Sequence, residues 1–305
     1  NLRIIRMMIG GQRWGFQYSP YAYFNEHCIF LDQKHIPMII NQQTLINLVD
    51  IEKQLPEYFV GSNADLPIVG GSMLAHEHYQ GGRHIFPMMK AKIKKEIYFE
   101  KYPEVKAGIV DWPMSDLRLI SKDSLDLIDL GSKIINFWDH YSDPNRQIKA
   151  FEGKNRHHTV TPIMHREGDR FILDLVLRDN NTSDEYPLGI FHPHAELWHI
   201  KKENIGLIEV MGRAILPGRL KGELEEVKKY LLNQDNRIAD SHLDWARKLK
   251  ADSQITKENV DSILQQALVE IFDQVLECAG VFKNNKDGEI GWQKFTDALI
   301  SEVDR

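Results

Sequence analysis

A histidine-rich segment between two pairs of glycines is the part of the sequence best equipped for chemistry. It runs from Gly70 to Gly82 and carries His76, His78 and Gln80 at alternate positions. Side chains alternate between the faces of a strand, so the spacing predicts that these three polar groups point the same way. Such a row is costly to bury unless it binds a ligand or is paired internally. The flanking glycines would let the backbone approach phosphate oxygens closely.

An imidazole in this setting can act as a nucleophile toward phosphorus. It needs one ring nitrogen free and the other fixed by a hydrogen bond. The carboxamide of Gln80 can donate to a phosphoryl oxygen as charge develops in the transition state, but it cannot supply a proton as a third histidine could. The pattern therefore favours a covalent phosphohistidine that is passed to a second acceptor. The alternative is a polar strand that faces solvent and carries ordinary surface histidines.

These residues also resemble a known motif. His76-x-His78-x-Gln80 is similar to the motif of the transferase branch of the histidine-triad superfamily, in which glutamine replaces the last histidine. Three longer stretches narrow the resemblance to the type 2 family of galactose-1-phosphate uridylyltransferases. These stretches are residues 21–28 (YAYFNEHC), 61–67 (GSNADLP) and 191–194 (FHPH) followed by 201–212.

The resemblance implies a ping-pong transfer. His78 would attack the α-phosphorus of UDP-glucose and release glucose 1-phosphate, and galactose 1-phosphate would then take the uridylyl group and leave as UDP-galactose. Gln80 would hold phosphate oxygens, and His76 would support the nucleophile strand or a nearby metal. Three further residues are implied to bind the substrate: Asn63, Gly71 and Ser72.

A second His-x-His pair, His192 and His194, lies in the later part of the chain. The resemblance implies that this pair helps to bind a structural zinc or iron ion, although no cofactor is established by the sequence. Two histidines on one strand face are a known ligand arrangement. The third ligand stays open, with His158 and His199 as candidates, and the alternative is a surface or interface pair.

The elements around the two histidine pairs are predicted to repeat. A helix over 45–58 is expected to begin at a cap by Thr44, and a helix over 125–140 at a cap by Ser124. An isoleucine stands four positions before each cap, and a His-x-His pair follows each helix. This order indicates two diverged copies of one strand–helix–strand unit, with a chance match as the alternative.

Other segments complete the prediction. Besides the extended segment through His76 and Gln80, strands are predicted over 23–31, 108–120, 157–164, 170–178, 188–200 and 205–212. The second helix is expected to bury Leu125, Ile128, Ile134, Ile135 and Trp138. Beyond residue 220 the pattern becomes helical, with helices over 220–232, 241–250 and 257–279, the last capped by Thr256 and ended by Gly280.

Together these elements predict an α+β fold made of two tandem histidine-triad-like units with antiparallel sheets and flanking helices, plus a helical C-terminal tail. The first unit, which carries the nucleophile, is expected over 1–95. The second unit is expected over 96–219 and the helical region over 220–305.

The composition excludes several classes of protein. The 305 residues are 42% hydrophobic and carry a formal net charge of -6, which argues against a protein that coats nucleic acid. No run approaches the 18 consecutive apolar residues of a membrane span. The two cysteines, Cys28 and Cys278, are far apart and form no Cys-x-x-Cys, which excludes a Cys-only zinc site and fits a reducing cytoplasm.

The resemblance implies a homodimer and an N-terminal part that this chain lacks. Two other functions stay open. One is a different nucleotidyltransferase of the same superfamily, acting on dinucleoside polyphosphates. The other is a non-catalytic nucleotide-binding fragment that keeps the fold.

Overall fold

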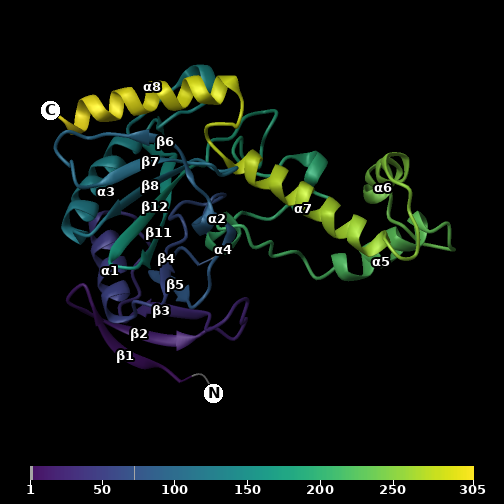
Figure 1. Cartoon of the computed structure of the whole chain (residues 1–305), viewed down its shortest axis with the longest axis horizontal. Helices are drawn as coiled ribbons and strands as arrows, with labels where there is room; N and C mark the ends of the chain where they lie inside the picture. Colours follow the sequence, from purple (N-terminus) through teal and green to yellow (C-terminus); the bar gives the residue numbers. More distant parts are fainter. Residues whose placement is uncertain (1–2, 72) are drawn as a thin grey trace.

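Ten strands pair into one antiparallel sheet in the computed structural model, which describes residues 3–71 and 73–305 (Figure 1). In chain order they are β1 (Ile5–Ile9), β2 (Gln12–Tyr18), β3 (Cys28–Asp32), β4 (Phe59–Gly61), β5 (His78–Gly82), β6 (Ile93–Ile97), β7 (Lys106–Val110), β8 (Asp116–Ser121), β11 (His158–Glu167) and β12 (Arg170–Asp179). A separate small ribbon pairs β9 (Phe151–Glu152) with β10 (Asn155–Arg156). The predicted α+β class with antiparallel pairing is confirmed.

The two halves of the sheet share one connectivity. From one edge the strand order is β1-β2-β3-β5-β4, and from the opposite edge it is β6-β7-β8-β12-β11. The halves meet where β4 pairs with β11, with Gly61 opposite Ile163. The matching order supports two diverged units that merge in a single sheet. Strand β6 straddles the proposed boundary at residue 95 and pairs with β7 in the second half; the division into 1–95, 96–219 and 220–305 stays a proposal.

Eight helices accompany the sheet in the part of the chain that the structure describes. They are α1 (Gln42–Gln54), α2 (Pro87–Lys90), α3 (Ser124–Trp138), α4 (Leu207–Val210), α5 (Leu220–Leu231), α6 (Asp240–Asp252), α7 (Val260–Ala279) and α8 (Lys286–Val303). Helices α1 and α3 pack on one face of the sheet, and α8 packs on α3. At Gly131 of α3 an added Cβ would lie 2.9 Å from Leu45 Cδ1 and 3.0 Å from Leu173 Cδ2. The absence of a side chain there lets α3 approach both α1 and β12.

Both predicted helix caps are displaced by one or more residues. Helix α1 is capped by Asn41, whose Oδ1 accepts from the backbone N–H of Thr44 at 3.3 Å, while Thr44 Oγ1 accepts from the Asn41 N–H at 3.2 Å. Thr44 is thus the reciprocal partner in a capping box. Helix α3 is capped by Asp123, whose carboxylate accepts from Leu125 N at 2.7 Å, and Ser124 is its first helical residue.

Three other expectations differ from the structure. Residues 188–200 and 205–212 form no strand; they hold the 3₁₀ turn η2 (Ala195–Leu197) and the short helix α4. Leu125 is 70% exposed, because it lies in the first turn on the solvent side of α3. Helix α7 begins after an Asn259 cap, not at Thr256, although it does end at Gly280.

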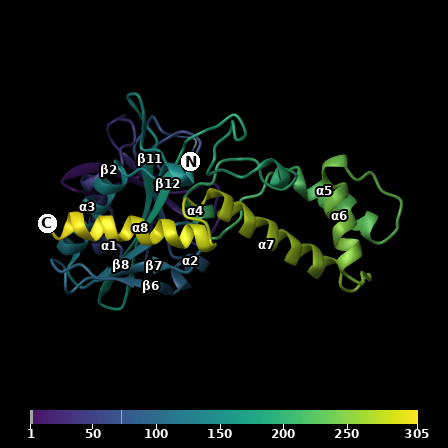
Figure 2. The same ribbon diagram turned by 90° about the horizontal axis from the view of Figure 1, so that it is seen from above.

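The sheet face opposite α1 and α3 is covered in its centre by the second half of the chain. Phe59 and Ile163 on this face pack with Leu207 of α4 and with the C-terminal part of α7. Farther along, α5, α6 and the start of α7 project away from the sheet and share a small core of their own (Figures 1 and 2). None of the helices described is long and apolar enough to cross a membrane.

Candidate active site

His78 is the first residue of β5 and lies on the face that α1 and α3 leave uncovered. The next residue, Tyr79, points to the helical face, where its hydroxyl accepts from Asn47 of α1 at 2.9 Å. The His78 ring is 5% exposed, and its Nδ1 lies 2.9 Å from the carbonyl oxygen of His76. A carbonyl can only accept, so Nδ1 carries the proton and the neutral ring presents its lone pair at Nε2. Burial lowers the pKa of His78, which keeps the ring neutral.

Gln80 is held by His27, a residue to which the sequence motifs assign no role. His27 Nε2 lies 3.0 Å from Gln80 Oε1. His27 Nδ1 accepts from the backbone N–H of Tyr23 at 3.4 Å, which leaves Nε2 as the donor. Because the carboxamide oxygen is occupied, the amide N–H groups of Gln80 stay available to donate. The partner of Gln80 lies 53 residues away, and no local pattern in the sequence reports that contact.

His76 lies before β5, so it does not continue the row of side chains formed by His78 and Gln80. Its Nε2 donates to the carbonyl of Asp32 at 2.8 Å, and its ring lies against His35 with 4.1 Å between the ring centroids. The link from His76 to His78 is through the backbone carbonyl. His76 therefore fixes the backbone just before β5.

Asn63 and Gly71 lie against each other. Continuing the register of β4 and β5, in which Gly61 pairs with Gln80, brings Asn63 level with His78. An added Cβ at Gly71 would lie 2.6 Å from Asn63 Nδ2, so a larger residue there would displace the amide. Asn63 is buried, and its Oδ1 accepts from the backbone N–H of Leu207 at 2.8 Å, which ties this loop to α4. Ser72, the third residue expected to bind substrate, lies outside the described residues.

The second histidine pair does not converge on one point. His192 is buried, and its Nε2 lies 3.3 Å from Asn204 Oδ1. His194 instead stands near Glu196 and Cys278. Burial lowers the pKa of His192. In this arrangement the pair does not fit a shared zinc or iron ion.

Neither candidate for the third metal ligand belongs to a group of possible metal ligands among the described residues. His158 is fully buried, stacks on Trp138 with 3.9 Å between centroids, and bonds through Nε2 to Asp179 at 3.0 Å. His199 packs between His242 and Trp245. Packing and hydrogen bonding within the protein explain the His158 ring. The Nδ1 of His199 donates to the Glu196 carbonyl at 2.9 Å, whereas its Nε2 is buried and has no hydrogen-bond partner among the described residues.

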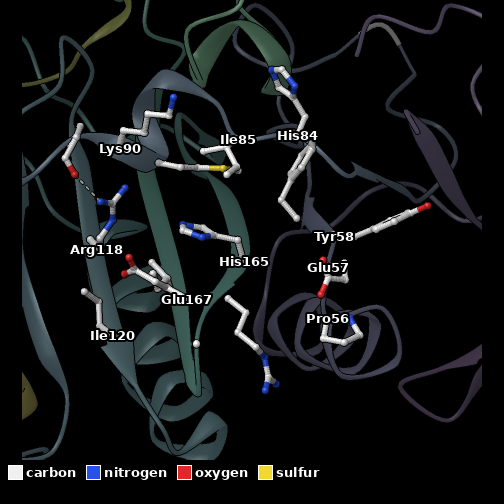
Figure 3. A pocket seen from close by; sticks show the side chains of 16 residues that line it. Pro56, Glu57, Tyr58, His84, Ile85, Lys90, Arg118, Ile120, His165 and Glu167 are labelled. Carbon is white, nitrogen blue, oxygen red and sulfur yellow. Dashed lines mark hydrogen bonds between the residues drawn. The ribbon is translucent and has the colours of Figure 1, made fainter. Parts of the chain in front are cut away.

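A cavity of about 880 Å³ lies on the same face as His78 but contains none of the predicted site residues (Figure 3). Arg118 lines one side and Tyr58 the other, with His165 between them. Its arginines are largely engaged: Arg118 pairs with Asp174 at 2.6 Å. This cavity therefore does not mark the candidate site, which is defined by the side chains of His78 and Gln80.

Comparisons with known proteins agree with the motif around His78. Residues 51–247 match the family model described as galactose-1-phosphate uridyl transferase, C-terminal domain. The chain is 77% identical over 303 residues to a galactose-1-phosphate uridylyltransferase of Lactobacillus helveticus, covering 99% of this chain and 62% of that protein. It is 60% identical over 299 residues to the protein of the same name from Pediococcus pentosaceus, covering 98% of this chain and 61% of that protein.

Solved structures are more distant. A DUF4931 family protein from Bacillus cereus has a TM-score of 0.38 and 10% identity, covering 60% of this chain and 88% of that one. Yeast Ap4A phosphorylase Apa2 has a TM-score of 0.36 and 10% identity, covering 60% of this chain and 73% of that one. The family assignment rests on the sequence relatives, of whose length the chain spans about 62%. On that evidence the chain belongs to the galactose-1-phosphate uridyl transferase family.

Proposed function

We propose that the protein transfers a uridylyl group from UDP-glucose to galactose 1-phosphate through a covalent intermediate on His78. The observation that carries this proposal is the hydrogen bond from His78 Nδ1 to the His76 carbonyl, which leaves Nε2 as a free nucleophile. The relatives named galactose-1-phosphate uridylyltransferase supply the choice of substrates.

In the first step the Nε2 lone pair of His78 attacks the α-phosphorus of UDP-glucose. A phosphorus–nitrogen bond forms, the bond from the α-phosphorus to the bridging oxygen breaks, and that oxygen leaves with its electron pair as part of glucose 1-phosphate. The imidazole gains positive charge, which the Nδ1–H shares with the His76 carbonyl. Neither step needs an external proton.

In the second step a phosphate oxygen of galactose 1-phosphate attacks the same phosphorus from the vacated side. The phosphorus–nitrogen bond breaks, its electron pair returns to Nε2 of His78, and UDP-galactose forms. Two in-line displacements give net retention of configuration at phosphorus. Gln80 donates its amide N–H to a phosphoryl oxygen in both transition states, in the orientation that His27 holds.

The remaining expectations belong to the same proposal. Asn63, Gly71 and Ser72 would bind the substrate, with Asn63 as the link between the nucleophile strand and α4. A homodimer and a cytoplasmic location are proposed from the resemblance. Acting on dinucleoside polyphosphates and binding nucleotides without turnover are the two alternatives.

The test is to incubate the protein with UDP-glucose labelled in the uridine and to isolate the denatured protein. Label is expected on the wild type and absent from His78→Ala. His140→Ala is the matched control. His140 is an exposed histidine just beyond the end of α3, so this variant should retain full labelling.

The same experiment separates the alternatives. Labelling by an adenine nucleotide but not by UDP-glucose would favour the dinucleoside polyphosphate reaction. Binding of UDP-glucose without labelling would favour a non-catalytic role. Label that persists in His78→Ala would refute His78 as the nucleophile.

A further inference from the structure

A buried arginine near the end of β12 connects the sheet to the loop that leads into α4. Arg178 is 1% exposed; its Nη1 donates to Thr161 Oγ1 at 3.2 Å and its Nη2 donates to the Ile205 carbonyl at 3.0 Å. We propose that Arg178 is a positioning residue, which fixes this loop and through it the side chain of Asn63. The inference rests on the proposed function, because that function gives Asn63 its role in binding substrate.

The first arm of the bridge leads directly to Asn63. Two residues after Ile205, the backbone N–H of Leu207 donates to Asn63 Oδ1 at 2.8 Å. Between them, an added Cβ at Gly206 would lie 3.2 Å from the same oxygen, so the loop packs against the Asn63 amide. A shift of the Ile205 carbonyl would therefore move the donor that orients Asn63.

The second arm reaches the strand beside Asn63. The Ser62 N–H donates to the Pro162 carbonyl at 3.0 Å, so the pairing of β4 with β11 continues beyond Gly61 and brings Asn63 level with Thr161. The guanidinium thus joins the loop and the sheet on both sides of one amide. Its planar fork presents donors in fixed directions, whereas a lysine ammonium is a single point of charge.

The charge of Arg178 is costly to keep where it is. Burial lowers its pKa to about 10, so the group is still protonated at neutral pH. Its two acceptors are neutral, its Nε is buried without a partner among the described residues, and Glu209 is paired instead with Lys201 at 2.6 Å. An apolar side chain of similar volume would fill this space without desolvating a charge. Phosphate groups bound beside Asn63 would offset part of that cost.

The same guanidinium stands beside the second histidine pair. Burial lowers the pKa of His192, and the positive charge of Arg178 lowers it further. His192 Nε2 lies 3.3 Å from Asn204 Oδ1, one residue before the carbonyl that Arg178 holds. In the described structure, a guanidinium therefore fastens to the sheet the loop for which the resemblance implied a metal ion.

The test is a double-mutant cycle on the binding of UMP, measured by titration calorimetry, since UMP binds without transfer. Asn63→Ala and Arg178→Met should each weaken binding by about ten-fold, the value of one hydrogen bond to a charged group. The variant with both changes should bind no more weakly than the weaker single variant, whereas independent residues would give a loss of about a hundred-fold. Arg178→Lys keeps the charge but cannot span both acceptors, and should behave as Arg178→Met does.

The matched control is Arg170→Met, which removes an exposed arginine from the same strand and face and should leave the UMP affinity unchanged. Near-ultraviolet circular dichroism and urea unfolding check that each variant is folded. If Arg178→Met does not fold, Thr161→Val takes its place in the cycle, because it removes one acceptor and keeps the shape of the side chain.

Three results would overturn the inference: losses that multiply in the double variant, wild-type affinity in Arg178→Met, or wild-type affinity in Arg178→Lys. Labelling of His78 is measured separately. A labelled wild type with multiplying losses refutes the role of Arg178 alone. An unlabelled wild type in which the losses do not multiply refutes the transfer reaction alone.

Discussion

A single backbone carbonyl decides which nitrogen of His78 carries the proton. The His76 carbonyl accepts from Nδ1, and Nε2 makes no hydrogen bond to any residue that the structure describes. His27 fixes Gln80 in a similar way. Its Nε2 donates to the carboxamide oxygen of Gln80, which leaves the amide N–H groups of Gln80 available to donate. At the residue scale the proposed site is thus a set of fixed tautomers and orientations, held by groups that never touch the reacting phosphorus.

One prediction concerns His27, which we regard as a positioning residue. His27→Phe keeps a ring against Phe24, 4.4 Å from it between centroids, but removes the donor to Gln80. We expect kcat to fall about three- to ten-fold, the value of one hydrogen bond of roughly 1 kcal/mol, with KM for UDP-glucose little changed. Steady-state kinetics measure this. An equal fall after Gln80→Ala, with no added loss in the double variant, would establish that the two act as a unit.

The second prediction is the pH dependence of His78 labelling. Burial lowers the pKa of His78 from its ordinary value of 6.5, so the folded protein keeps the reactive neutral ring below that pH. The single-turnover rate of labelling should be level above pH 6.5 and should fall only at lower pH, as the ring takes up a proton. Rapid-quench measurements across this range test it, and an acid limb centred above pH 6.5 would contradict the assigned environment.

At the element scale, the hydrogen bonds that cap the helices join residues only a few positions apart in the chain. The capping box of Asn41 and Thr44 and the Asp123 cap are local hydrogen bonds. Gly131 has a different role, since it allows three elements to come together. Leu45 from α1 and Leu173 from β12 occupy the space that a side chain at Gly131 would need.

The third prediction follows from that close approach. Gly131→Val should lower the free energy of unfolding by about 1–3 kcal/mol, because the added Cβ would lie 2.9 and 3.0 Å from the leucines of α1 and β12 and the two methyl groups of valine need still more room. Gly222→Val is the control, since nothing lies within 4 Å of an added Cβ on α5. Urea unfolding monitored by tryptophan fluorescence measures both. Equal stability of the two variants would show that α3 does not depend on this contact.

At the scale of the whole molecule, the two halves of the sheet share one connectivity but carry different side chains at corresponding strands. Strand β5 carries His78 in the first half, and β12 occupies the same place in the second. On β12 the equivalent face holds Asp174, paired with Arg118 at 2.6 Å, and the buried Arg178. The second half of the sheet has the same strand order as the first. On β12 it has a buried ion pair, whereas β5 in the first half has the proposed nucleophile.

The fourth prediction concerns the projecting helices. Helices α5 and α6 share a small cluster around Val227, Leu231 and Ala246 and stand away from the sheet (Figures 1 and 2). Few buried contacts mean a low free energy of local opening, so their amides should exchange hydrogen faster than those of β11 and β12. Hydrogen exchange followed by mass spectrometry tests this, and uniform protection would argue that the arm and the sheet unfold as one.

Much of this protein can be predicted from sequence because the relevant forces are local. Alternation and flanking glycines predict the strand β5 with His78 and Gln80 on one face, although the strand begins at His78 and leaves His76 outside it. Apolar spacing predicts α1, α3, α5 and α6 to within a few residues. The motif around His78 also identifies the family. These features depend on residues close together in the chain, whose conformational preferences do not require contacts with distant segments.

Other features were decided only by tertiary packing. The predicted repeat paired the His76/His78 segment with the His192/His194 segment. In the sheet the strand that corresponds to β5 is β12, and His192 and His194 lie in a loop beyond it. The partner of Gln80 is His27, and the neighbour of His194 is Cys278. Such pairs join distant parts of the chain, and the periodicity of the sequence cannot predict them. Strand pairing and helix packing bring them together, because the apolar faces of the sheet and helices must be buried before any of these polar groups can meet.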